Sequence, residues 1–179
     1  MTLNLYLNSM KFKNPLLILL ICCFYIQTIA QNNKATIEEI QAHYYALKQK
    51  MKASADAEYP MYYIVKIEEN VDKMSMPAVG NYYGTDEFWY LPDEAVGTYG
   101  KEGILVYRKS EFQISARTEW KEYVFKNGKL VFCFVKIDQG GEYRYYFKDD
   151  ILVKYAEKDA EDGFYNKEDG KYLLKYAKE

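Results

Sequence analysis

The sequence contains few of the residues on which most catalytic and metal sites depend. It has one histidine and three cysteines among 179 residues. A zinc site needs three or four histidine and cysteine ligands, and only His43 and Cys133 follow the apolar N-terminal segment, so zinc is excluded. The nucleophile elbow of hydrolases, the phosphate-binding loop and the dinucleotide-binding glycine motif are also missing. We therefore expect no cofactor and no metal site and assign no catalytic residue. These absences favour a non-enzymatic protein but leave an enzyme as an alternative.

Neither sign of charge is in large excess. The chain has 24 Lys and Arg residues against 26 Asp and Glu residues, and the two signs are interleaved. A protein that binds nucleic acid needs a basic excess to neutralise phosphates, so we expect no nucleic-acid partner. The acidic segment at residues 159–169 lacks the ligand spacing of an EF-hand calcium loop, and we interpret it as a solvated turn.

A long apolar run is missing as well. A helix that spans a membrane needs about 20 apolar residues, and the run at residues 16–26 has about half that number. Two lysines precede this run and the small side chains of Thr28 and Ala30 follow it, which is the order of a secretory signal peptide. We predict that residues 1–30 are a signal peptide. The mature chain would begin at Gln31, in the periplasm or outside the cell, with no permanent membrane anchor.

Two other interpretations of the N-terminus remain open. The residues before Met10 carry no charge, which suggests that translation begins at Met10. Lipid attachment at Cys22 or Cys23 would tether the mature protein to a membrane, although neither cysteine follows a small residue. After cleavage Cys133 is the remaining cysteine, so no intramolecular disulfide forms and the fold depends on its core.

The clearest periodic pattern in the chain predicts an amphipathic helix. Its apolar residues recur at spacings of three and four, which places them on one face: Ile37, Ile40, Tyr44, Leu47 and Met51. Thr36 and Glu39 have the spacing of a capping box, so the helix is expected to begin at Thr36, after disordered residues 31–35. Two heptads are short for a coiled coil, so we expect the apolar face to pack on the protein's own sheet.

Apolar and β-branched runs between turn residues predict an antiparallel sheet. A strand is expected at residues 61–69, another within 81–91, and two short ones at 104–109 and 112–116. The chain after Trp120 is predicted to form a four-stranded meander.

Three turns define that meander. The pair Asn127-Gly128 predicts a two-residue hairpin turn in which both residues take positive φ. Residues 138–141 and Asp149-Asp150 form the other two turns. The first turn predicts three strand pairs, namely Phe125 with Leu130, Tyr123 with Phe132, and Val124 with Val131.

Residues 123–131 and 145–153 are similar at an offset of 22 positions, which we interpret as a local duplication of one hairpin. Alternation along the strands sorts the side chains by face. One face is predicted to carry Tyr123, Phe125, Leu130, Phe132, Phe134, Tyr145, Phe147 and Leu152. The other is predicted to carry Trp120, Val124, Val131, Cys133, Val135, Tyr146, Val153 and Tyr155.

Both predicted faces are apolar, so each needs a cover. The N-terminal helix covers one of them. The other needs a C-terminal helix within residues 163–179, where Tyr172, Leu173 and Tyr176 have helical spacing, or else a curved sheet or a partner chain. We predict a single α+β domain over residues 36–179: an N-terminal amphipathic helix on an antiparallel meander, followed by a short C-terminal helix.

Tyrosine is abundant, with 20 residues. Its ring packs while its hydroxyl reaches water, which suits both half-buried sheet surfaces and recognition. Tyr82, Tyr83, Trp89 and Tyr90 are candidates for an exposed aromatic platform that stacks on a glycan or seats a peptide. The competing interpretation places them in the core of a strand. His43 and Cys133 lack the neighbours that a catalytic base or nucleophile needs, so we interpret both as structural.

The Tyr-x-Phe-x-x-Gly-x-Leu hairpin, the Tyr-Arg-Tyr-Tyr-Phe strand at residues 143–147 and the preceding helix resemble small, uncharacterised secreted proteins of Gram-negative bacteria. The resemblance covers roughly residues 120–155. It implies an envelope location and a compact α+β domain, and it assigns no functional residue.

These observations favour an exported, non-enzymatic binding or scaffold domain of the bacterial envelope. Its partner would be a protein, a peptide or a glycan. Two alternatives remain open, a carboxylate-dependent hydrolase and an obligate homodimeric structural protein that buries the second sheet face.

Overall fold

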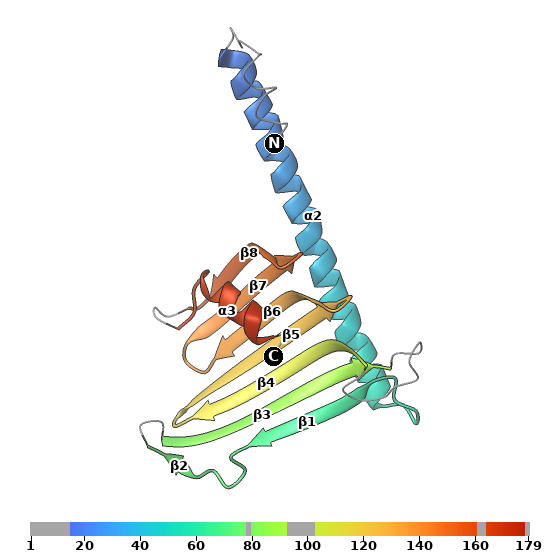
Figure 1. Cartoon of the computed structure of the whole chain (residues 1–179), viewed down its shortest axis with the longest axis vertical. Coiled ribbons are helices and arrows are strands. Elements are labelled where there is room, and N and C mark those ends of the chain that lie inside the picture. Colours follow the sequence, from blue (N-terminus) through green and yellow to red (C-terminus); the bar gives the residue numbers. More distant parts are fainter. Residues whose placement is uncertain (1–14, 78–79, 93–102, 161–163, 178–179) are drawn as a thin grey trace, which may run out of the picture. The chain divides into compact units, whose positions relative to one another are not determined.

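The computed structural model describes residues 15–77, 80–92, 103–160 and 164–177. Its elements in chain order (Figure 1) are α2 (Pro15–Ala55), β1 (Tyr63–Glu69), β2 (Ser75–Met76), β3 (Gly80–Leu91), β4 (Ile104–Ile114), β5 (Arg117–Lys126), β6 (Lys129–Ile137), β7 (Gly141–Lys148), β8 (Ile151–Lys158) and α3 (Asp169–Tyr176). The two helices and the antiparallel sheet confirm the predicted α+β class. None of the described helices has an apolar stretch long enough to cross a bilayer.

The chain divides into two compact units, with the boundary between Thr36 and Ile37. The prediction that the helix begins at Thr36 is wrong for the uncut chain, because α2 is continuous from Pro15 and includes residues 31–35. No glycine or proline follows Pro15 within α2, so nothing in the sequence stops the helix before Thr36. The signal peptide and the disorder of residues 31–35 concern the cut chain and stay predictions. All further description concerns the unit Ile37–Glu179.

In the described part of this unit, seven strands form one antiparallel sheet in the order β1-β3-β4-β5-β6-β7-β8. β2 pairs with β3 outside that order. The sheet is a meander because strands that are neighbours in the sheet follow one another along the chain, β2 aside. Positive φ at Asn127, Gly128, Asp149 and Asp150 confirms two of the predicted turns. The predicted four-stranded meander is thus part of a larger one.

One strand prediction is wrong. The two short strands expected at residues 104–109 and 112–116 are a single strand, β4, which runs unbroken through Ser110 and Glu111. These two residues carry no glycine or proline signal for a turn, so the extended backbone continues between β3 and β5.

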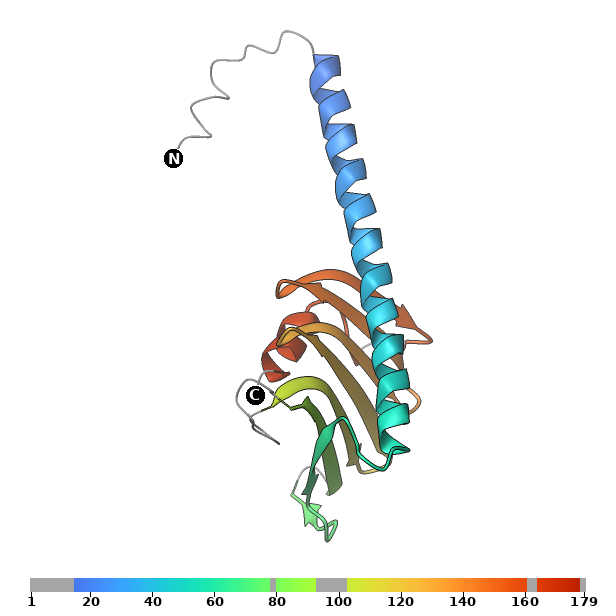
Figure 2. The same cartoon turned by 90° about the vertical axis from the view of Figure 1, so that its right-hand side faces the viewer.

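The second half of α2 covers one face of the sheet. Ile40, Leu47 and Met51 are buried there, which confirms the predicted apolar stripe. The sheet residues buried in the same cluster are Val106, Tyr107, Val124, Phe132 and Tyr146. Figure 2 shows this part of α2 on the opposite side of the sheet from α3.

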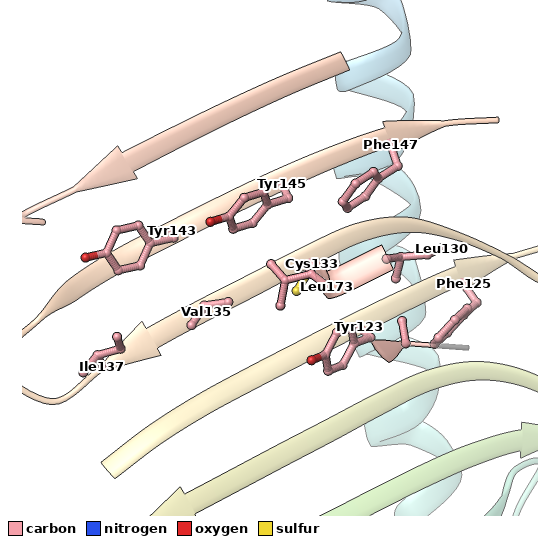
Figure 3. Close-up of a cluster of buried hydrophobic side chains, with 11 residues drawn as sticks. Tyr123, Phe125, Leu130, Cys133, Val135, Ile137, Tyr143, Tyr145, Phe147 and Leu173 are labelled. Atoms are coloured by element: carbon pink, nitrogen blue, oxygen red, sulfur yellow. The ribbon is translucent and has the colours of Figure 1, made fainter. Parts of the chain in front are cut away.

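The helix α3 covers the other face, as the C-terminal spacing predicted. Leu173 is completely buried in a cluster with side chains of β5, β6 and β7. Figure 3 shows these sheet side chains gathered around Leu173. Gly170 permits the close approach, since a Cβ atom there would lie 3.2 Å from Leu152 Cδ2 and 3.3 Å from Tyr145 Cδ1. The second face therefore has a cover within the chain at β5, β6 and β7. The homodimer stays a prediction.

β-Bulges correct the predicted sorting of side chains between faces. Phe125 pairs with Leu130 as predicted, but Val124 pairs with Phe132 and Tyr123 with Cys133. The extra residue in β6 is Val131, and Val153 is the extra residue in β8, 22 positions later. The duplicated hairpins therefore share the same bulge.

The bulges reverse the side on which several residues lie, because one inserted residue shifts the alternation of all residues after it. Phe132 and Phe134 belong to the α2 face, whereas Cys133, Val135 and Tyr155 belong to the α3 face. The sequence-based assignment of these five residues was wrong.

Candidate ligand-binding pocket

The four aromatic residues predicted as one platform all lie on β3, but on opposite faces of the sheet. Side chains alternate along a strand, so Tyr82 and Tyr90 face the α3 side while Tyr83 and Trp89 face the α2 side. All four are half-buried. They form no continuous platform, and a role of any one of them in binding stays a prediction.

Two of these residues pack against the protein's own aromatic side chains. The Trp89 ring lies 6.0 Å from the ring of Tyr62 between α2 and the sheet. Tyr82 stacks on Phe112 at 6.1 Å and donates a hydrogen bond to Glu69. These contacts are those of packed strand residues.

A different group of aromatic residues surrounds a hollow of ≈ 300 Å³ between α2 and the strands β6 and β7. We call it the aromatic pocket. Its volume lies at the lower end of the range of small-molecule sites. The residues that line it are Gln41, Tyr44 and Tyr45 from α2, Phe132 and Phe134 from β6, and Arg144 and Tyr146 from β7.

The aromatic pocket has a buried floor and an exposed rim. Phe132 and Tyr146 are 6% and 4% exposed and form the floor. Tyr45 is 65% exposed and stands at the rim with Gln41, whose side chain is also exposed. An apolar floor with a few polar groups at the opening is the usual composition of a ligand site.

The rings around the aromatic pocket are tilted relative to one another. The Tyr44 and Phe132 rings meet at 60°, and the Phe132 and Tyr146 rings at 50°. Tyr45 meets Tyr44 at 68°. The tilted rings therefore form a concave wall. No two of these neighbouring rings are parallel.

Hydrogen bonds hold α2 in place on this side of the sheet. Tyr44 donates to Glu122 at 2.7 Å, and Lys48 binds the same carboxylate at 3.1 Å. Lys48 also donates to the Tyr107 hydroxyl at 3.0 Å. Burial, and then the hydrogen bond to Glu122, raise the pKa of Tyr44 above its usual value, so this hydroxyl stays protonated. The network fixes the position of the Tyr44 ring in the pocket wall.

The cation in the pocket wall has a partner. Arg144 Nη2 lies 2.5 Å from Glu142 Oε2, and the guanidinium lies 5.0 Å from the centre of the Phe134 ring. The hydrogen bond from Arg144 lowers the pKa of Glu142, which keeps that carboxylate charged. Gln41 Nε2 donates to the Tyr146 hydroxyl at 3.2 Å. The wall therefore offers hydrogen-bonding groups to a ligand. The charge of Arg144 in this wall is already paired with that of Glu142.

No relative was found. The chain matches no protein-family model, no curated protein and no solved structure. The chemistry of the aromatic pocket is therefore argued from its own residues.

A second polar cluster lies buried below α3. Arg108 Nε donates to Asp86 Oδ1 at 2.9 Å, and Ser110 donates to the same oxygen. Arg108 Nη1 donates to the backbone oxygen of Tyr176 at 3.1 Å, at the end of α3. The charges are paired with each other and with α3, which is the arrangement of a structural ion pair.

The residues with catalytic potential have structural partners. His43 Nε2 lies 3.2 Å from the Phe125 carbonyl oxygen, which only accepts, so this nitrogen carries the proton. Cys133 is buried, and burial raises the pKa of its thiol. Within the described ranges, no three His, Cys, Asp or Glu side chains come together as a group able to hold a metal ion.

Sequence reasoning did not find the aromatic pocket. It placed Phe132 and Phe134 on the α3 face because it assumed an unbroken hairpin register. Gln41 and Tyr45 are exposed and are not among the five apolar residues of the α2 stripe, so the helical periodicity did not identify them as pocket residues. The one available signal was Tyr44, which the helical periodicity placed toward the sheet.

Proposed function

We propose that this chain is an exported, non-enzymatic binding domain of the bacterial envelope, and that the aromatic pocket is its ligand site. The observation that supports the proposal is the combination of a buried aromatic floor, Phe132 and Tyr146, with polar groups at an exposed rim. Binding of a ligand requires an apolar surface and hydrogen-bonding groups, and it does not require a reactive side chain.

The non-enzymatic part of the proposal rests on the chemistry of the described side chains. His43 hydrogen-bonds a backbone carbonyl, and the Cys133 thiol is buried. The carboxylate of Asp86 binds Arg108 and Ser110 inside the core. None of these groups faces the aromatic pocket, so a bound ligand would meet no nucleophile among them.

The export part of the proposal predicts cleavage between Ala30 and Gln31. The small residues Thr28 and Ala30 precede this bond, as signal peptidase requires. Cell fractionation followed by N-terminal sequencing tests it. A chain from the envelope fraction that begins at Gln31 supports export, and uncut chain confined to the cytosol contradicts it.

The binding part of the proposal is tested by a ligand-observed NMR screen of the purified protein against a mixed library of sugars, short peptides and metabolites. We expect a ligand that binds the wild-type protein and fails to bind Gln41→Trp, in which a large side chain occupies the rim. The matched control is Gln49→Trp, an exposed position on the same helix that does not line the pocket. Ligands that bind both variants equally contradict the site, and a library without any ligand contradicts the proposed function.

A further inference from the structure

We infer that the aromatic pocket binds the ring of a neutral sugar. This inference rests on the proposed binding function and adds the chemical class of the ligand. The argument has three steps, which concern the shape of the wall, the polar groups at the rim, and the charges.

The shape of the wall suits a puckered ring better than a planar one. A flat heterocycle stacks on aromatic rings, and two parallel rings would contact both of its faces. The rings of Tyr44, Phe132 and Tyr146 meet at 60° and 50°, so these neighbours offer no such parallel pair. A sugar ring is puckered and carries C–H groups on its faces. Such groups carry partial positive charge and are attracted to the negative face of an aromatic ring. The concave wall therefore matches a sugar better than a flat base.

The polar groups at the rim require a ligand that makes hydrogen bonds at its edge. Gln41 brings its amide to the rim, 3.2 Å from the Tyr146 hydroxyl, and Arg144 and Tyr45 belong to the same lining. A purely apolar ligand would remove water from these groups without replacing its hydrogen bonds, which is unfavourable. Sugar hydroxyls lie around the ring and both donate and accept.

The charges near the wall favour a neutral ligand. Arg144 is paired with Glu142, and Glu122 is paired with Lys48. The ammonium of Lys154 lies 5.8 Å from the centre of the Tyr146 ring, but Lys154 does not line the pocket. An acidic ligand would have to compete with Glu142 for Arg144, so an uncharged ligand fits the pairing that is present.

Saturation-transfer NMR with the purified full-length protein tests the inference. The probes are methyl glucoside, methyl galactoside, N-acetylglucosamine and cellobiose as neutral sugars, glucuronate as an acidic sugar, and adenosine as a flat heterocycle. We expect at least one neutral sugar to bind. Its affinity is expected to change less than about twofold between low and high salt, since no net charge is neutralised on binding.

Two variants connect the binding to the aromatic pocket. Tyr45→Ala removes an exposed ring from the rim and is expected to weaken the sugar at least about fivefold. Tyr59→Ala is the matched control, because Tyr59 is 84% exposed and does not line the pocket. Equal affinity of the wild type and Tyr45→Ala would overturn the assignment.

The results also separate this inference from the proposed function. If glucuronate or adenosine binds in a way that depends on Tyr45 and no neutral sugar does, the sugar inference fails and the binding function stands. The same holds if only a peptide from the mixed library binds. If no probe and no library member binds, both fail.

Discussion

Arg108 lies in a cage of aromatic rings below α3. Its guanidinium is 5.0 Å from the ring centre of Phe88, 5.4 Å from that of Tyr123 and 4.8 Å from that of Tyr176. It is also paired with Asp86, and both side chains are almost fully buried. Removing one charge of such a pair leaves the other buried and uncompensated.

The first prediction at the residue scale concerns this pair. Asp86→Ala is expected to lower the free energy of unfolding by about 3–5 kcal/mol, whereas Asp86→Leu combined with Arg108→Met recovers most of the loss. Urea unfolding measures both. The exposed pair of Lys66 and Glu68 supplies the control, because Glu68→Ala should leave stability nearly unchanged. A single variant as stable as the wild type would contradict the structural role.

The second residue-scale prediction concerns Cys133. Its thiol is buried and its pKa is raised by burial, so a thiol reagent should not react with it in the folded protein at neutral pH. In denaturant, the chain cut after Ala30 should expose one reactive thiol, and the uncut chain three. A colorimetric thiol assay counts them. Rapid reaction in the folded state would show that β6 is not enclosed.

At the scale of elements, the sheet depends on a cover for each face. The α2 cover was predictable because its five apolar residues follow the helical repeat. The α3 cover was predictable in outline from Leu173 and Tyr176. Tyr172, which has the same helical spacing, is 57% exposed. The depth of α3 on the sheet depends on Gly170, whose role the sequence did not reveal.

The prediction at this scale concerns Leu173. Leu173→Ala leaves a cavity between α3 and the sheet and is expected to cost about 2–5 kcal/mol of stability. Lys171→Ala on the exposed side of the same helix should have little effect. Denaturant unfolding followed by circular dichroism compares them. Equal stabilities would mean that α3 does not cover this face.

At the scale of the whole molecule, buried tyrosines make the fold sensitive to alkali. Burial raises the pKa of Tyr107, Tyr123 and Tyr165 above the usual value of about 10. Tyr145 is raised for the same reason. The folded state therefore holds these protons at a pH where the unfolded chain has lost them.

The sign of the pH dependence follows from this difference. Above about pH 10 the unfolded state binds fewer protons than the folded state, so the free energy of unfolding falls as the pH rises, and below that pH this contribution is fully present. Urea unfolding across the alkaline range measures the fall. The part of the tyrosinate absorbance that comes from these buried rings should appear together with the loss of the β-sheet signal in circular dichroism. Ionisation of most tyrosines in a protein that remains folded would contradict the enclosure of these rings.

The sequence by itself determined the fold class, the apolar face of α2, the tight turns and the existence of α3, because each depends on local periodicity or on residues that accept positive φ. Tertiary structure decided which aromatic residues lie together. The bulge at Val131 shifts the alternation in β6 and places Phe132 and Phe134 beside Tyr44 rather than beside Tyr123. The bulge at Val153 shifts the alternation in β8 and places Tyr155 on the α3 face. A bulge is settled by pairing between strands and by packing on both faces. For that reason the aromatic pocket could not be predicted from any single stretch of the chain.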